Sequence, residues 1–290
     1  MTSAWRAGLG MVFFAYDGSI NGDWVSHYAV QIAAAQDRPT LALLHVRTGH
    51  IAEPLLDEKL QRLRAECTQR GVRLVEHLLA PIGGSVLAAI RAAVPIGPEH
   101  FLICGTRARA RGGRFLRGTL GERFLRADHC NVLIVRVLQP GVLGSPRRLL
   151  LPLREHPHAL RSALPVLRLF EPQITQLHLV LVARVGHRRF SALSHARAEE
   201  LRAPGLAYCT QVEQALVGAL GLGATLMDAH VVVSDRIPHE ILIAAQRTKS
   251  RLICMEASRR HGAMRLIAGD PVEQVLREAT CDVLVYRGLV

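Results

Sequence analysis

The chain has 290 residues, a length that favours two domains of ordinary size over one. Hydrophobic residues make up 49% of the chain and charged residues 21%, which excludes a disordered or fibrous protein. The net charge of +12 is compatible with a polyanionic partner, but aromatic residues, at 4%, are too scarce for the stacking platforms of single-strand binders. We therefore do not expect nucleic acid as a partner.

The chain carries no sequence signal for a membrane or for export. No stretch approaches the roughly 18 consecutive apolar residues of a spanning helix, and the first residues lack the basic-then-apolar layout of a signal peptide. The six cysteines include no CxxC pair, and four of them flank apolar, strand-like runs. These features predict buried thiols in a reducing compartment, no membrane partner and a cytoplasmic location.

An internal repeat organises the sequence. Phe101–Gly105 is echoed by Arg251–Met255, and Cys130–Arg136 is echoed by Cys281–Arg287. The spacing between copies grows along the chain, so the second copy carries an insertion, which we place within 186–222.

The junction between the copies is a segment with two prolines and two glycines at 139–146. We predict one domain over residues 1–140 and a second over 147–290.

Within each copy, short apolar runs alternate with amphipathic stretches of helical length. In the first copy these runs predict strands near 10–16, 40–46, 73–79, 100–104 and 131–136. The stretches between them predict helices near 22–36, 53–70, 83–94 and 119–128. In the second copy we expect strands near 148–153, 175–183, 227–233, 251–255 and 282–286. This alternation predicts an α/β protein with two tandem doubly wound, five-stranded parallel sheets, each with helices on both faces. Ligands of such sheets bind at the carboxyl ends of the strands where the winding reverses, here after the first and fourth strands.

A carboxylate follows the first predicted strand. Asp17 stands at the expected carboxyl edge, with Gly18 and Ser19 behind it in a turn. Such an acid can accept hydrogen bonds from an amino group or a ribose hydroxyl. It can equally serve only to cap the next helix, because Asp is favoured at helix starts. Both interpretations stay open.

A glycine-containing, basic loop follows the fourth strand. Gly105 ends the strand, and Gly118-Thr119 opens the next helix, where free amides, a hydroxyl and the helix dipole suit phosphate oxygens. The loop between them adds positive charge through Arg107, Arg109, Arg111, Arg114 and Arg117. The alternative is a solvated basic loop before an ordinary helix.

These features resemble a tandem universal stress protein, with both copies covered almost end to end. That family is marked by an Asp at the end of the first strand and by a loop of the form GxxG, nine residues, then G(S/T). Its ATP-binding members hold adenine and ribose near the first feature and phosphates on the second. The resemblance implies a Rossmann-like fold related to adenine-nucleotide alpha-hydrolases, with ATP, or AMP or ADP, as ligand. It implies a nucleotide site formed by Ala15, Tyr16, Asp17, Ser19, Val46, Gly105, Arg107, Ala108, Gly118, Thr119 and Leu120.

Two positions of the first copy depart from the family pattern. Ala108 stands where the second loop glycine belongs, and its methyl group costs about 1 kcal/mol or more if that position needs positive φ, which weakens binding about tenfold. Ala15 and Tyr16 replace the commoner Pro-Val, and we expect Tyr16 to narrow the adenine pocket.

The second copy lacks most of the pattern. Arg154 replaces the acid, Met255 and Ser258 replace the loop glycines, and Gly269-Asp270 replaces Gly-Ser/Thr. An Asp at that helix start repels phosphate. We therefore expect no ATP site in this copy. The resemblance implies instead that the two copies pair through their fifth strands, and a homodimer is a further expectation.

Other chemistries find little support in the sequence. Neither lysine follows a glycine, which excludes a P-loop, and no GxSxG elbow is present. His156 and His158 lack a third ligand at suitable spacing, so we expect no metal and no catalytic residues, with slow ATP hydrolysis at most. Two hypotheses remain. The chain is either an ATP-binding stress-response regulator that uses its N-terminal domain, or a nucleotide-free interaction protein of the same fold that binds protein or polyanion partners through its basic surface.

Overall fold

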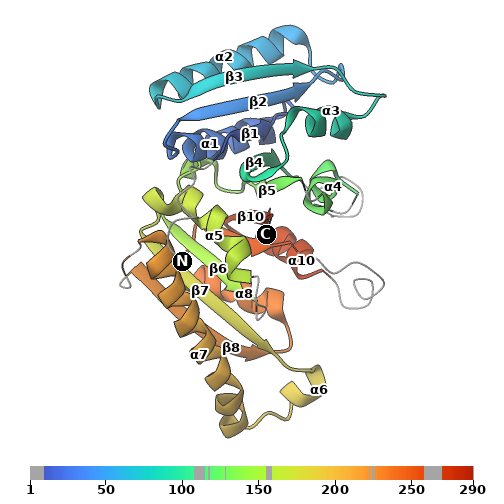
Figure 1. Cartoon of the computed structure of the whole chain (residues 1–290). Helices are drawn as coiled ribbons and strands as arrows, with labels where there is room; N and C mark the ends of the chain where they lie inside the picture. The colour runs from blue at the N-terminus through green and yellow to red at the C-terminus, as the bar shows by residue number, and fades with distance from the viewer. Residues whose placement is uncertain are drawn as a thin grey trace. The chain divides into compact units, whose positions relative to one another are not determined.

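The computed structural model describes residues 10–107, 115–116, 118–127, 129–154, 159–221, 223, 226–257 and 270–289. The chain forms two compact units, each described here by itself (Figure 1). The first unit comprises residues 1–107, 116–145 and 286–290, and the second comprises 108–115 and 146–285.

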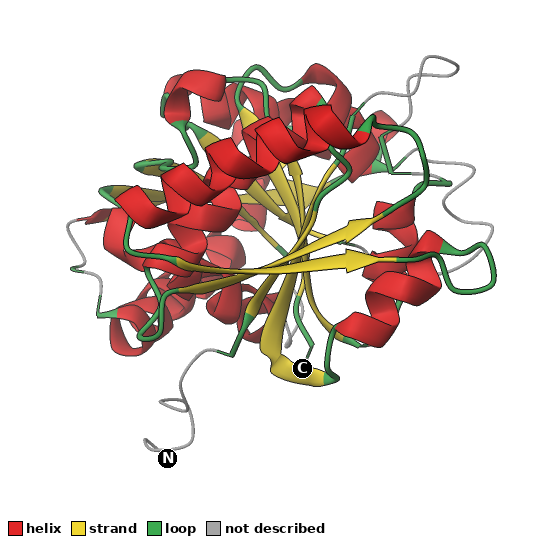
Figure 2. Cartoon of the chain, turned by 90° about the horizontal axis from the view of Figure 1, so that it is seen from above, coloured by secondary structure: helices red, strands yellow, loops and turns green. Residues whose placement is uncertain are grey.

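The first unit is an α/β sandwich. Its described strands are β1 (Val12–Ala15), β2 (Thr40–Val46), β3 (Arg73–Leu79), β4 (Gly97–Gly105) and β5 (Cys130–Arg136). They run parallel in the order β3-β2-β1-β4-β5. The connecting helices are α1 (Ile20–Ala34), α2 (Glu53–Gln69), α3 (Val86–Ala93) and α4 (Leu120–Arg126). Because α1 contacts α2 and α3 contacts α4, helices cover both faces of the strands (Figure 2). Buried apolar strands of this kind are typical of a doubly wound sheet.

Local sequence accounts for these helices. Ser19 caps α1, since its Oγ accepts a hydrogen bond from the Gly22 amide. Helix α2 buries Leu56, Leu60, Leu63 and Cys67, whose spacing of three and four residues places them on one face. Helix α3 begins later than predicted because Gly83 and Gly84 have positive φ and Ser85 is its N-cap.

The second unit repeats this arrangement with additions. Its described strands are β6 (Arg148–Leu153), β7 (Gln176–Arg184), β8 (Met227–Ser234), β9 (Leu252–Glu256) and β10 (Asp282–Arg287), in the order β10-β9-β6-β7-β8. The last two residues of β10 are grouped with the first unit. Its described helices are α5 (Ala159–Phe170), α6 (His187–Phe190), α7 (His195–Leu220), α8 (Ile237–Arg247) and α10 (Pro271–Glu278). Two 3-10 turns, η1 (Pro140–Val142) and η2 (Glu171–Gln173), precede β6 and β7.

The predicted α/β class and the predicted strands are confirmed, with ends that differ by a few residues. The first strand is shorter than predicted, and helix α4 ends at Arg126 because Ala127 takes an extended conformation. The connection between β7 and β8 is longer than that between β2 and β3, and the extra residues, within the predicted range, form α6 and lengthen α7, which ends at Gly221 with φ of +67°.

The cysteines behave as predicted. All six are buried and free of disulfides. Among the described helices, none is both long and apolar enough to cross a membrane.

Candidate functional site

The candidate site begins at the turn after β1. Asp17 is exposed, and its Oδ1 accepts hydrogen bonds from the Ser19 amide (3.0 Å) and from Ser19 Oγ (2.7 Å). Ser19, rather than Asp17, is the N-cap of α1. Asp17 therefore braces the capping residue with one carboxylate oxygen, and its Oδ2 has no protein partner among the described residues.

Glycines let the chain pack closely behind this carboxylate. Gly18 has φ of +74°, and a side chain there would collide with Ile51. A Cβ at Gly22 would lie 2.7 Å from Asp17 Oδ1, so the first turn of α1 rests directly against the acid. This close approach holds the Asp17 side chain at the carboxyl edge of the strands.

Strand register brings several predicted residues to the same edge. Ala15 of β1 pairs with Leu44 of β2 and with Cys104 of β4. Extending that register by two residues places Asp17 level with Val46, the buried last residue of β2, and with the residue that follows Gly105. Ala15, Val46 and Gly105 thus lie at the carboxyl ends of three neighbouring strands, and Asp17 follows the end of β1, at the edge where the sequence predicts a site.

Gly105 is needed for packing. A Cβ on it would lie 2.5 Å from Asn21 Nδ2 and 3.2 Å from Val25 Cγ2, so α1 lies against the end of β4. Arg107 is exposed two residues later and adds positive charge to the edge. Ala108 and the remaining loop arginines, Arg109, Arg111, Arg114 and Arg117, lie outside the described residues.

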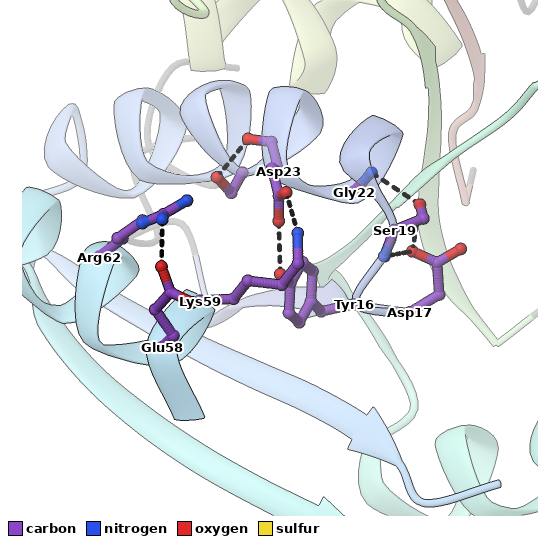
Figure 3. Close-up of polar contacts among 9 residues, drawn as sticks. Tyr16, Asp17, Ser19, Gly22, Asp23, Glu58, Lys59 and Arg62 are labelled. Carbon is purple, nitrogen blue, oxygen red and sulfur yellow. Dashed lines mark hydrogen bonds and ion pairs between the residues drawn. The ribbon is translucent and has the colours of Figure 1, made fainter. Parts of the chain in front are cut away.

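The Tyr16 side chain joins a polar cluster between β1, α1 and α2 (Figure 3). Its hydroxyl donates a hydrogen bond to Asp23 Oδ1 at 2.5 Å, and Lys59 forms an ion pair with the other oxygen of Asp23. The Lys59 side chain is 10% exposed, and that of Asp23 is 34% exposed. Burial, followed by the hydrogen bond to Asp23, raises the pKa of Tyr16 far above its ordinary range.

The pattern of the sequence does not predict this cluster. That Tyr16 narrows an adenine pocket stays a prediction; in the structure its hydroxyl binds Asp23, and its ring lies 5.6 Å from Phe14 and 6.3 Å from His45, centroid to centroid. One signal was available, because Lys59 is one of only two lysines in a chain rich in arginine. A compact ammonium group suits a partly buried pair with a single carboxylate.

The predicted phosphate-binding helix start has a different partner. Gly118 has φ of +75°, and its amide donates to Glu122 Oε2 at 2.7 Å. Thr119 is the N-cap of α4, where its Oγ1 accepts from the Glu122 amide (3.2 Å) and donates to the Leu116 carbonyl (2.6 Å). Leu120, the first residue of α4, is partly exposed. The Glu122 carboxylate thus accepts a hydrogen bond from the Gly118 amide, which the sequence predicts as a phosphate ligand.

The matching positions of the second unit have structural partners of their own. Asp270 caps α10, since its Oδ1 accepts from the Val272 amide at 3.1 Å, and Met255 is buried in β9. Arg154 follows β6, and its carbonyl accepts a hydrogen bond from the Tyr208 hydroxyl at 2.9 Å. His156, His158, Ser258 and Gly269 lie outside the described residues. The described residues contain no group of three metal-binding side chains.

Residues 147–287 match the family model described as Universal stress protein family. This half of the chain is a universal stress protein domain. The match does not extend to the N-terminal repeat, although that repeat keeps more of the motif residues. No curated protein is similar to the chain in sequence.

Solved structures resemble the universal stress protein domain and its N-terminal repeat together. A universal stress protein from Archaeoglobus fulgidus is 19% identical, with 96% of each chain covered and a TM-score of 0.59. A putative universal stress protein from Pseudomonas aeruginosa is 15% identical, covering 99% of this chain and 95% of that one, with a TM-score of 0.58. The cytoplasmic domain of a prokaryotic cation chloride cotransporter is 10% identical, covering 97% and 96%, with a TM-score of 0.58. At these identities the likeness establishes the fold alone.

Proposed function

We propose that the chain is a tandem universal stress protein whose N-terminal repeat, residues 1–140, binds an adenine nucleotide such as ATP and acts as a stress-response regulator. The observation that carries the proposal is the Asp17 carboxylate, which keeps one oxygen unpartnered among the described residues at the carboxyl edge, level with Val46. Such an oxygen accepts hydrogen bonds from ribose hydroxyls or an amino group. The parallel strand order of the two units and the fold likeness over the whole chain support the tandem assignment.

A phosphate chain bound on this repeat has to compete with Glu122. A nucleotide phosphate that takes the Gly118 amide displaces the Glu122 carboxylate, while Arg107 favours the added negative charge. The same hydrogen bond favours a second candidate function, a nucleotide-free interaction protein of this fold, because a carboxylate already satisfies the amide.

The second repeat, residues 147–290, has a different part in the proposal. Asp270 at the start of α10 disfavours phosphate there, so we assign ATP to the N-terminal repeat alone. We also propose that the repeats pair through their fifth strands. This pairing is what the resemblance to tandem universal stress proteins implies. Six free, buried cysteines support a cytoplasmic location. A homodimer remains part of the proposal.

Calorimetric titration of ATP into the full chain tests the proposed nucleotide site. We expect one saturable site per chain and a loss of affinity of about 10- to 100-fold in Asp17→Ala, since hydrogen bonds to a charged group contribute about 1.5–3 kcal/mol. Asp37→Ala is the matched control, because Asp37 is an exposed acid in the turn before β2 and its removal changes the net charge equally.

Two further variants separate the candidate functions. Glu122→Gln and Ala108→Gly should each tighten ATP binding if phosphate occupies the start of α4. Absence of binding by the wild type up to millimolar ATP, with no nucleotide copurified, would refute the proposed site and leave the interaction protein as the better account.

A further inference from the structure

The second unit carries a histidine–aspartate pair at the carboxyl edge of its strands. Strands β7 and β8 end together, with Arg184 opposite Ser234 and the Val185 amide donating to the Ser234 carbonyl at 3.1 Å. Helix α6 starts at His187, and Asp235 follows β8 directly. Helix α6 belongs to the insertion, so the first repeat has no counterpart of His187.

Asp235 fixes the orientation of the His187 ring. His187 Nδ1 lies 2.6 Å from Asp235 Oδ2, and Asp235 is 11% exposed at its side chain, whereas His187 is 84% exposed. The hydrogen bond from His187 holds the pKa of Asp235 below its usual range, so this group is a carboxylate at neutral pH. Because the Asp235 carboxylate can only accept a hydrogen bond, the proton of the ring lies on Nδ1. Nε2, on the other side of the ring, is then available to a ligand.

Guanidinium groups without carboxylate partners lie near this ring in the chain. Arg184 ends β7, Arg188 and Arg189 follow His187, and Arg154 follows the adjacent strand β6. None of these four forms an ion pair with a described residue, whereas Arg197 and Arg202 on α7 pair with Glu200 and Glu199. Arg184 lies opposite Ser234, the residue before Asp235, so the ends of β7 and β8 lie about 5 Å apart, whereas β6 ends opposite Leu181, three residues before the end of β7.

We propose that these residues form a binding site for a phosphate group. The site, here called the His187 edge, consists of Arg154, Arg184, His187, Arg188, Arg189 and Asp235. A guanidinium presents a planar fork of donors that matches phosphate oxygens, and the fixed His187 ring borders this group of donors. Asp235 alone would repel an anion, but the four arginines outnumber this single carboxylate and set the sign of the local potential. The His187 edge uses the second unit only, so the proposal stands apart from nucleotide binding by the first repeat.

The His187 edge fits a single phosphate better than other ligands. Its basic residues are confined to the ends of neighbouring strands and the first turn of α6, a small patch that suits one dianion, whereas a nucleic acid requires a longer basic track. A transition metal requires more protein ligands than the one imidazole and one carboxylate found among the described residues here.

The proposal is tested by titrating the full chain with orthophosphate at constant ionic strength. Proton–nitrogen NMR of the histidine side chains follows the chemical shifts of the His187 ring, which report on this site alone. The His187 signals are identified by their loss in His187→Gln. We expect them to show an Nδ1 proton and to shift saturably at millimolar phosphate. The double variant Arg184→Gln/Arg188→Gln should raise the dissociation constant for phosphate at least fivefold. The Asp235→Asn variant should also raise it, because the His187 ring loses its fixed orientation.

Matched controls and a second probe decide the outcome. Arg197→Gln with Arg202→Gln removes the same charge from α7 and should leave the titration unchanged. AMP binding more tightly than orthophosphate identifies an organic phosphomonoester as the source, and equal binding identifies the free anion. A His187 signal that does not respond up to 20 mM phosphate, an equal loss in the control variant, or a response only to an oligonucleotide would overturn the proposal.

Discussion

Replacement of Lys59 by methionine probes the cluster that joins β1, α1 and α2. Methionine keeps a flexible apolar stem of similar length but removes the ammonium group, so Asp23 loses its ion-pair partner and keeps the Tyr16 hydroxyl. We expect the substitution to lower the free energy of unfolding of the first unit by about 2 kcal/mol.

The burial of the two partners sets this magnitude. Removing one partner from a fully buried pair costs about 3–5 kcal/mol, whereas exposed pairs contribute about 0–1 kcal/mol. The Lys59 side chain is 10% exposed and Asp23 is 34% exposed, so water partly screens the carboxylate that remains. The expected loss therefore lies between the two limits.

Urea unfolding followed by tryptophan fluorescence measures the effect. Of the two tryptophans of the chain, Trp24 lies in α1 of the first unit, and its signal reports on that unit. Arg62→Met is the control, because Arg62 lies on the same helix and pairs with Glu58, but its side chain is 72% exposed. We expect the control to cost less than about 0.5 kcal/mol.

A double-mutant cycle with Tyr16→Phe extends the test. Because Tyr16 and Lys59 bind the same carboxylate, the costs of Tyr16→Phe and Lys59→Met should be non-additive by about 0.5 kcal/mol or more. Equal stability of Lys59→Met and Arg62→Met, with additive behaviour in the cycle, would show that the cluster does not stabilise the unit and that the reasoning is wrong.

Three further predictions concern stability. Burial raises the pKa of Cys104 to about 12 and of Cys130 to about 11, from an ordinary value of 9.0. The protonated thiols therefore stabilise the fold below pH 9, and this stability is lost as the pH rises toward 11–12. The midpoint of urea unfolding under reducing conditions should be lower at pH 10.5 than at pH 8, and equal midpoints would contradict this prediction. Gly144→Ala should cost about 3 kcal/mol, because Gly144 has φ of +71° and a Cβ would lie 2.4 Å from a carbonyl of α1, whereas Gly141→Ala meets open space and should be nearly neutral in thermal melts. Thr119→Ala should cost about 1 kcal/mol through loss of the α4 cap, and Thr119→Ser should restore stability; a neutral alanine variant would argue against the cap.

The sequence predicts those features of the site that depend on a single strand or helix. Apolar runs and the repeat determine which segments are strands. Val46 ends β2 and Asp17 follows the end of β1, so the parallel order of these strands places both residues at one edge whatever the details of packing. What Asp17 does with each oxygen was left open by the sequence, since Asp and Ser are both capping residues. The structure resolves it by making Ser19 the cap.

Contacts between elements were decided only by the tertiary structure. Glu122 at the Gly118 amide, Asp23 between Tyr16 and Lys59, and Asp235 at His187 each depend on a rotamer and on the approach of another segment. The partners of the last pair are 48 residues apart in the chain. Periodicity and composition determine which face of an element is buried, because burial is an average over many residues. The pairing of two polar groups depends on distances of a few tenths of an ångström, which only the packed chain defines.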